Sequence, residues 1–188
     1  MNIFYLDHNP DACAEQHCDK HVVKMCIEYA QLLSTAHRVI DGQEWEGRSV
    51  NGRKIKRYFL EDPIMNDNVY KACHVNHPSN KWVRDSRENY NWLYDMWMSL
   101  GREYTHRYGR VHESIRKLEY YLLLPPNGLE RKGFTQPTPA MSSYPQCIVE
   151  GDSIKSYRNF YWEDKREFAK WTRRRIPAWW SEYERKRR

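Results

Sequence analysis

Apolar residues recur every three or four positions in three long stretches of the chain, which is the spacing of a buried helical face. The first stretch begins at Asn9-Pro10, a good N-cap followed by a proline suited to the first helical turn, and runs to about Val39. The second runs from about Ser79 to Tyr108 and the third from Asp152 to about Arg175. The pattern predicts a mostly α-helical protein.

Shorter elements are expected between these helices. Asn51-Gly52 is a type I′ turn signal, which predicts a small β-hairpin made of Glu46–Val50 and Arg53–Leu60. His112–Leu124 has the spacing of a further helix, and residues 125–151 are rich in Pro, Gly, Ser and Thr, as in an ordered loop or lid. At 188 residues, we expect a single-domain helical bundle with a basic, partly frayed tail over residues 173–188.

The first predicted helix is apolar around most of its circumference, as a central helix would be. One polar stripe interrupts it, made of His17, His21, Lys24, Glu28, Gln31 and Thr35. Such a stripe either reaches solvent or lines a pocket. In a pocket, His21 and Glu28 would act as acid or base, with Lys24 as a cation, nucleophile or further base.

His17 and His21 are four residues apart, which is the spacing by which one helix supplies two metal ligands. An outside carboxylate such as Asp7 would complete a site for iron, zinc or manganese. The zinc-protease and di-iron helix patterns are both absent, so a structural polar stripe is the competing interpretation. His37 falls on the apolar side, where a hydrogen-bonded core histidine is expected.

Cationic residues beside this stripe suit phosphate groups. They are Lys20, Lys24 and Arg38. A lysine among apolar neighbours could also form a Schiff base with an abasic sugar, whereas plain solvation of the lysines is the alternative.

A second cluster lies in the loop before the second predicted helix. Pro78 forces His77 into an extended backbone, so its ring can project away from the helix. Asn76, His77 and Arg84 would then surround a helix N-terminus, which is an anion-binding arrangement, and His77 is a further catalytic candidate. Ordinary capping by Ser79 or Asn80 is the alternative.

Aromatic and basic residues alternate at Tyr104–His112 and again at Tyr157–Trp162. Such pairs can stack bases and bind phosphate. The residues assigned to this role are Arg107, Tyr157, Arg158 and Tyr161. The competing interpretation is core packing.

Positive charge is concentrated at the C-terminal end. Residues 155–188 hold 12 Lys/Arg against 5 Asp/Glu, whereas the protein as a whole carries +6. Basic residues beside tryptophans, here Arg173, Arg174 and Arg175, are typical of nucleic-acid contacts. A nucleic acid or nucleotide is therefore the expected partner.

Other features narrow the function classes. There is no apolar run of about 18 residues and no leader-like start, so no membrane partner is expected. The five cysteines lack paired spacing, which favours buried free thiols in a cytoplasmic protein. No Gly-rich phosphate loop or dinucleotide fingerprint is present, which disfavours ATP- or NAD-dependent chemistry by those routes.

Four motifs together resemble a family of tailed-phage proteins found in T4-like phages and cyanophages. They are His17–Met25, Leu32–Arg38, Asn76–Pro78 and Glu103–Gly109, spread over about 100 residues. The resemblance implies a setting, the cytoplasm of a bacterial host, and no mechanism.

These observations favour a phage-type enzyme that acts on nucleic acid or a nucleotide, by base modification, glycosidic-bond chemistry or phosphate-ester chemistry. Its pocket would combine the polar stripe, the Asn76–Pro78 loop and the helix that carries Arg158. The alternative is a non-catalytic nucleic-acid-binding or host-interaction protein that uses its basic C-terminal segment.

Overall fold

The computed structural model describes residues 1–185. This part forms eight α-helices and one antiparallel hairpin, so the expected mostly helical fold with a small hairpin is confirmed. The helices are α1 (Pro10–Gln16), α2 (Asp19–Ile40), α3 (Pro63–Asn68), α4 (Pro78–Val83), α5 (Arg87–Tyr108), α6 (Glu113–Leu118), α7 (Ser153–Phe160) and α8 (Ala178–Arg185). The strands are β1 (Gln43–Arg48) and β2 (Lys54–Phe59), and a π-helical turn, Tyr161–Lys165, continues α7.

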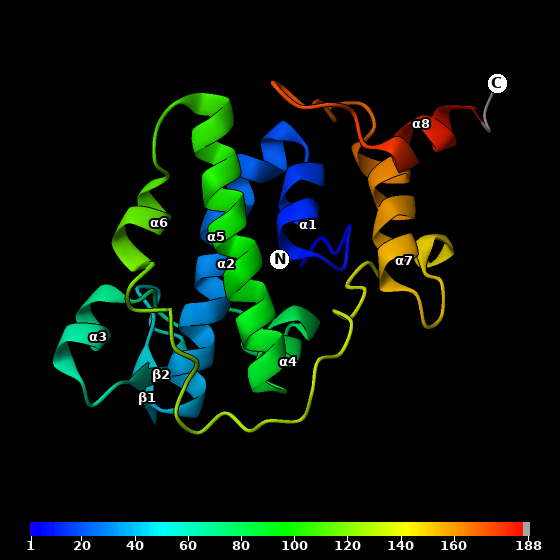
Figure 1. The fold of residues 1–188 in the computed structure, drawn as a ribbon. Coiled ribbons are helices and arrows are strands. Elements are labelled where there is room, and N and C mark those ends of the chain that lie inside the picture. The colour runs from blue at the N-terminus through cyan, green and yellow to red at the C-terminus, as the bar shows by residue number, and fades with distance from the viewer. Residues whose placement is uncertain (186–188) are drawn as a thin grey trace.

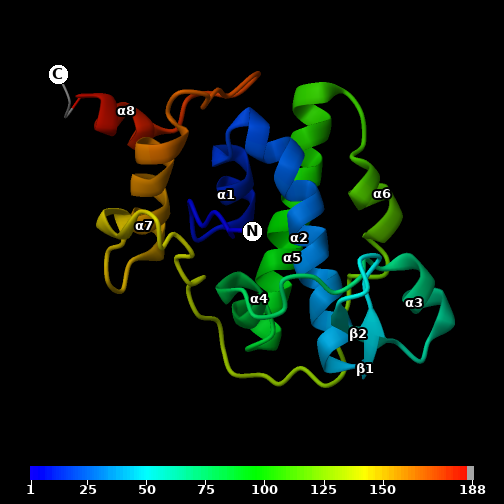
Figure 2. The same ribbon diagram turned by 180° about the vertical axis from the view of Figure 1, so that it is seen from behind.

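Helices α2 and α5 lie side by side through the middle of the molecule, with α1 packed against α5 (Figure 1). The hairpin and α3 lie at one end, and α7 and α8 at the other, as the view from behind also shows (Figure 2). Trp97 on α5 is fully buried, and its indole nitrogen donates a hydrogen bond of 2.8 Å to the Cys26 carbonyl of α2. The core therefore forms along the α2–α5 contact.

The first predicted helix is broken into α1 and α2, so its expected continuity was wrong. The His17 ring lies 2.8 Å from the Cys13 carbonyl, and His17 itself has extended backbone angles. The Asp19 amide then donates to the Lys170 carbonyl at 2.8 Å instead of continuing the helix. The predicted start was right, since the Asn9 side chain caps α1 and Pro10 opens it.

The other long helices are also shorter than predicted. Ser86 begins α5 as its N-cap, which separates α5 from α4, and Gly109 ends α5 with a positive φ of 72°. Asp152 caps α7 as expected, yet α7 passes into the π-helical turn after Phe160. The stretch predicted over His112–Leu124 is helical only as α6.

The hairpin is confirmed, but its turn is different. Gly52 has a φ of +73°, whereas Asn51 is not among the described residues with positive φ, so the turn is not type I′. The Gly52 amide donates to the Ser49 carbonyl at 2.9 Å, and the Ser49 amide donates to the Arg53 carbonyl at 2.8 Å. The loop is therefore longer than two residues.

Residues 125–151 form a loop, as predicted, apart from a short 3-10 turn at Pro145–Cys147. Four of the five free cysteines, all except Cys73, are buried, in line with the expectation of free thiols. No helix in residues 1–185 is both long and apolar enough to cross a membrane. The last three residues of the predicted basic tail lie outside the described part.

Candidate functional site

A carboxylate on α2 lies between two amino groups. Oε1 of Glu28 is 3.0 Å from Nζ of Lys24, one helical turn away, and Oε2 is 3.9 Å from the amino group of Met1. The Glu28 side chain is 16% exposed, whereas that of Lys24 is 66% exposed. The carboxylate is thus mostly enclosed and opens to the surface beside Lys24.

The loop before α4 adds a histidine to this region. His77 is the N-cap of α4, and its Nδ1 accepts a hydrogen bond from the Ser79 amide at 3.2 Å. This assigns the ring proton to Nε2, which leaves Nε2–H as a donor. The predicted cap at Ser79 or Asn80 was therefore wrong, because His77 itself caps the helix.

Two side chains behind the loop hold its shape. The amide of Asn80 donates to the carbonyls of Cys73 and His74, each at 2.9 Å. Arg84 donates to the carbonyls of Val75 at 2.5 Å and Asn80 at 3.1 Å. Nε and Nη2 of Arg84 are thus used on backbone carbonyls, while its buried Nη1 has no hydrogen-bond partner within the described residues, so the phosphate role of Arg84 stays a prediction. Asn76 remains exposed on the loop.

Hydrogen bonds connect the loop to α2 and to the N-terminal residue beside Glu28: the Cys73 amide donates to Oγ1 of Thr35 at 3.2 Å, and the Ser79 hydroxyl donates to the Met1 carbonyl at 3.4 Å. Burial lowers the pKa of His77, and the Met1 amino group and His74 lower it further, while Glu28 opposes them. Burial raises the pKa of the Cys73 thiol, and Glu28 adds to that shift. We call Lys24, Glu28, Cys73, His74 and His77 the Glu28 cluster. The sequence assigned no role to Cys73, and it placed His74 in the same histidine- and asparagine-rich loop without giving it one.

His21 and His17 lie elsewhere, in the core. His21 is 5% exposed, stacks on Phe4 with ring centroids 4.1 Å apart, and has its Nδ1 2.5 Å from the Tyr161 hydroxyl. Burial lowers its pKa to about 2. The His17 ring nitrogens lie 2.8 Å from the Cys13 carbonyl and 2.9 Å from the Tyr29 hydroxyl. His21 is therefore a core residue, and the prediction that it is catalytic was wrong.

The metal pair is not supported by this geometry either. Both nitrogens of His17 are engaged in hydrogen bonds, and the helix break removes the expected i, i+4 relationship with His21. Among residues 1–185, no group of three or more His, Cys, Asp or Glu side chains is arranged to hold a metal ion. His37 is the core histidine that was predicted, with Nε2 2.8 Å from the Tyr90 hydroxyl.

The predicted base-stacking tyrosines are also part of the core. Tyr157 and Tyr161 are fully buried, so the expectation that they stack bases was wrong. Arg158 donates twice to the Leu6 carbonyl, at 2.8 and 3.1 Å, and its guanidinium lies over the Trp179 ring. The helical spacing of these aromatic residues reflects packing between α7 and the N-terminal segment.

Two predicted phosphate-binding arginines are internal. All five donor positions of Arg38 are used on oxygens of neutral groups, and its side chain is 5% exposed. Arg107 is paired with Glu103 and Asp19 at 2.6 and 2.8 Å. Their assignment to phosphate was wrong because each already satisfies its donors within the fold.

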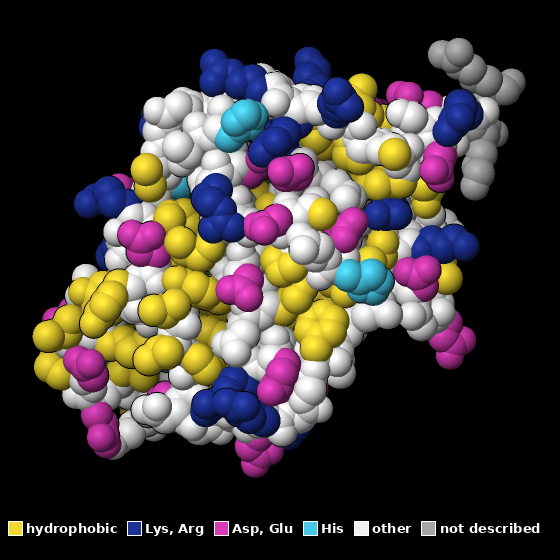
Figure 3. Space-filling model, viewed as in Figure 1, with side chains coloured by type: hydrophobic (Ala, Val, Ile, Leu, Met, Phe, Trp, Pro, Cys, Tyr) yellow, Lys and Arg dark blue, Asp and Glu magenta, His cyan; other side chains and the backbone are white. Residues whose placement is uncertain are grey.

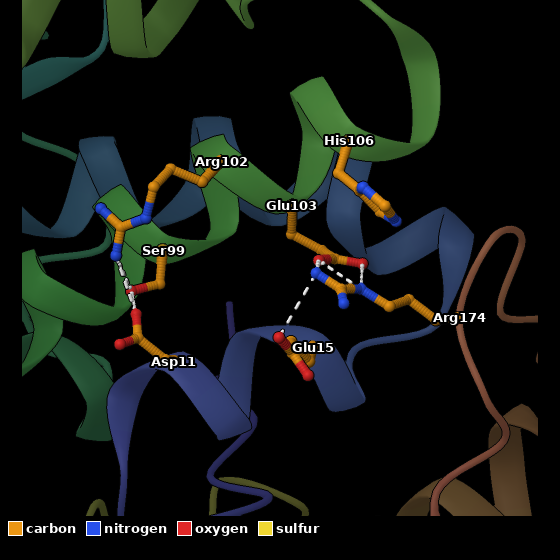
Figure 4. A pocket seen from close by; sticks show the side chains of 7 residues that line it. All are labelled: Asp11, Glu15, Ser99, Arg102, Glu103, His106 and Arg174. Carbon is orange, nitrogen blue, oxygen red and sulfur yellow. Dashed lines mark hydrogen bonds and ion pairs between the residues drawn. The ribbon is translucent and has the colours of Figure 1, made fainter.

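Part of the basic segment before α8 is held by ion pairs to α5 and α1 (Figure 4). Nε of Arg174 donates to Oε1 and Oε2 of Glu103 at 3.0 and 2.9 Å, and Nη2 donates to Oε2 at 2.7 Å and lies 3.3 Å from Glu15. Arg173 and Arg175 are exposed. Lys20 is exposed as well, with its ammonium 4.4 Å from the Phe168 ring centre. Among the cations predicted to bind nucleic acid in this segment, Arg174 therefore has a structural role, whereas Arg173 and Arg175 remain on the surface.

A further surface feature is an apolar patch where α3 approaches the segment after α6 (Figure 3). Its most exposed members are Ile64, Tyr120 and Leu124. None of its residues belongs to the Glu28 cluster. No known family model, no curated protein and no solved structure matches this chain.

Proposed function

We propose that the protein is an enzyme that acts on nucleic acid at a glycosidic bond or at the abasic sugar that such cleavage leaves. One observation carries the proposal: the Lys24 amine lies 3.0 Å from the enclosed carboxylate of Glu28. A primary amine next to a carboxylate supplies a nucleophile for a sugar aldehyde together with an acid–base group. Of the reaction classes expected from the sequence, this pair favours glycosidic-bond chemistry.

The proposed step begins with proton transfer from the Lys24 ammonium to Glu28. The amine then attacks C1′ of the ring-opened abasic sugar, and its lone pair forms the new C–N bond. Glu28 returns the proton to the carbonyl oxygen, the nitrogen loses its second proton to solvent, and the oxygen leaves as water after a further protonation. Loss of water leaves the protonated imine, the iminium that borohydride reduces. The Met1 amino group is a second amine within 3.9 Å of the same carboxylate.

Other residues of the cluster would position the substrate. The Nε2–H of His77 is a donor for a sugar or phosphate oxygen, because Nδ1 is already used on the Ser79 amide. The exposed side chains of Lys20 and Asn76 add further contacts for an anionic strand. The bacterial-host setting implied by the sequence resemblance fits such a substrate. The non-catalytic alternative is less favoured, since Arg174 of the C-terminal segment is used on Glu103.

Trapping with sodium borohydride tests this proposal. Oligonucleotides that carry one abasic site, single-stranded and duplex, are incubated with the wild type, Glu28→Gln, Lys24→Ala and the exposed-lysine control Lys170→Ala. We expect a covalent adduct with the wild type and with Lys170→Ala, reduced at least tenfold in Glu28→Gln. Peptide mapping should place the adduct on Lys24, so Lys24→Ala should form less of it. No adduct, or an equal adduct with folded Glu28→Gln, would contradict the proposal.

A further inference from the structure

A groove of about 470 Å³ runs along strand β2 and the segment that follows α3. We call it the hairpin groove. It is lined by Arg38, Trp45, Arg48, Lys56, Arg57, Tyr58, Phe59, Asn66, Asp67, Val69, Lys71 and Ala72. It contains no member of the Glu28 cluster, so it is a separate surface.

The lining of this groove is strongly positive. Five of its residues are Lys or Arg, and one, Asp67, is acidic. Lys56 is neutralised by Glu44 at 2.8 Å, whereas no ion pair of Arg48, Arg57 or Lys71 occurs within the described residues. The surface cations are therefore available to an anionic ligand.

A buried charge adds to this field. The guanidinium of Arg38 donates to the Tyr58, Asn66, Val69 and Tyr70 carbonyls and to the Asn66 side-chain oxygen, at 2.6 to 3.0 Å. All these acceptors are neutral. Burial lowers the pKa of Arg38, while Asp67 acts in the opposite direction. A desolvated cation paired only with neutral groups favours an anion near the groove floor.

The groove also carries an exposed aromatic platform. Trp45 is 55% exposed and lies opposite Arg57 in the strand register, and Phe59, 49% exposed, is on the same face. A Cβ atom at Gly47 would be 3.1 Å from the Trp45 ring and from Cγ of Arg57. Because residue 47 has no side chain, one part of the Trp45 indole packs against the strand, and the other part of the ring faces solvent. Trp45 takes no part in the hydrophobic core.

We propose that the hairpin groove binds a single-stranded segment of nucleic acid, with one base stacked on Trp45 and phosphates at Arg48, Arg57 and Lys71. Stacking on an exposed indole beside a guanidinium is the sequence-tolerant way in which proteins hold unpaired bases. A duplex keeps its bases inside and cannot use such a platform. The inference needs no chemistry at Glu28, so it can fail or succeed independently of the proposed function.

Fluorescence anisotropy tests the inference. The probe is a labelled oligothymidylate of 12 residues, used without borohydride so that only reversible binding is measured. The variants are Trp45→Ala, Trp45→Phe and Arg57→Ala, with Tyr120→Ala and Arg131→Ala as controls for an exposed aromatic and an exposed cation elsewhere. We expect Trp45→Ala to weaken binding about tenfold or more, Trp45→Phe to weaken it less, and both controls to match the wild type. Arg57→Ala should weaken binding and make its salt dependence shallower.

Stacking itself has a spectroscopic signature. The oligonucleotide should quench part of the tryptophan fluorescence of the wild type, and that part should disappear in Trp45→Phe. Glu28→Gln should bind like the wild type, which separates this site from the proposed chemistry. Unchanged affinity of Trp45→Ala, equal or tighter binding of a duplex of the same length, or equal competition by polyglutamate would overturn the inference.

Discussion

Nε of Arg107 lies 2.6 Å from Oε1 of Glu103, one turn away on α5, and the two side chains are 0% and 2% exposed. The same guanidinium reaches Asp19 at the start of α2, and the same carboxylate holds Arg174. The pair therefore lies, buried, at the centre of an ion-pair network that joins α5, α2 and the segment before α8. Two guanidiniums, those of Arg107 and Arg174, are matched in it by three carboxylates, those of Glu103, Asp19 and Glu15.

Breaking this pair should be costly. Arg107→Ala leaves Glu103 buried with one of its two cations removed, and we expect the free energy of unfolding to fall by about 3–5 kcal/mol. Urea denaturation followed by circular dichroism measures the change. Arg102→Ala is the matched control on the same helix, because Arg102 is 65% exposed in its pair with Asp11 and should cost below about 1 kcal/mol. Equal losses in the two variants would contradict the assigned role of the network.

A second stability prediction concerns Gly101 on α5. A Cβ atom there would lie 2.7 Å from Cγ1 and 2.8 Å from Cδ1 of Ile115, so α6 packs directly on the glycine. Gly101→Ala should destabilise the protein by about 1–3 kcal/mol through overpacking, although alanine has the better helix propensity.

The destabilisation by Gly101→Ala should disappear when the Ile115 side chain is shortened. In an Ile115→Ala background, Gly101→Ala should be neutral or stabilising, by up to about 1 kcal/mol, because only the helix propensity remains. Thermal unfolding of the four proteins of this double-mutant cycle measures the coupling. Additive effects would show that the α5–α6 contact does not depend on the glycine.

The helical class and several helix ends were predictable because they depend on local signals. Asn9-Pro10, Asp152 and Gly109 act through capping and backbone angles that neighbouring residues determine. The break at His17 was not predictable, since it depends on contacts with Cys13 and the distant Lys170. Local periodicity carries no information about such long-range hydrogen bonds.

The candidate site was predictable only in part. Helical spacing placed Lys24 and Glu28 on one side of α2, and the structure puts them in contact. The same wheel grouped His21 with them, yet His21 is in the core, because Phe4 and Tyr161 from distant parts of the chain cover it. Whether a polar residue on such a stripe lines a functional site or forms a hydrogen bond in the core depends on the segments that pack over it. The sequence of one helix does not show which segments these are.

The two roles of His77 can be separated by substitution. Asparagine is a strong N-cap, so His77→Asn should keep the cap of α4 and leave the free energy of unfolding within about 0.5 kcal/mol of the wild type. The variant removes the Nε2–H donor that positions the substrate oxygen and should slow the proposed reaction by about 10- to 100-fold. Single-turnover kinetics of borohydride-trapped adduct formation measures the rate.

His77→Ala is the control that removes both roles. It should lose the same activity and also about 1 kcal/mol of stability. If His77→Asn reacts as fast as the wild type, His77 is only a helix cap and does not position the substrate.

Three of the four buried histidines have strongly lowered pKa values, which should make the fold sensitive to mild acid. Burial lowers the pKa to about 4 for His17, to about 2 for His21 and to about 4 for His37, whereas unfolding restores the ordinary value of about 6.5. Below pH 6.5 the unfolded chain therefore binds protons that the folded protein does not. This part of the stability is complete above pH 6.5 and is lost as the pH falls toward 4. The loss is about 1.4 kcal/mol per pH unit for each histidine once it is protonated in the unfolded chain.

Urea denaturation at pH 7.5, 6.0 and 5.0 measures how steeply the free energy of unfolding depends on pH. His37→Gln should reduce this slope, while the exposed His106→Gln should leave it unchanged. A free energy of unfolding that stays constant over this range would mean that the three rings are not held neutral by burial.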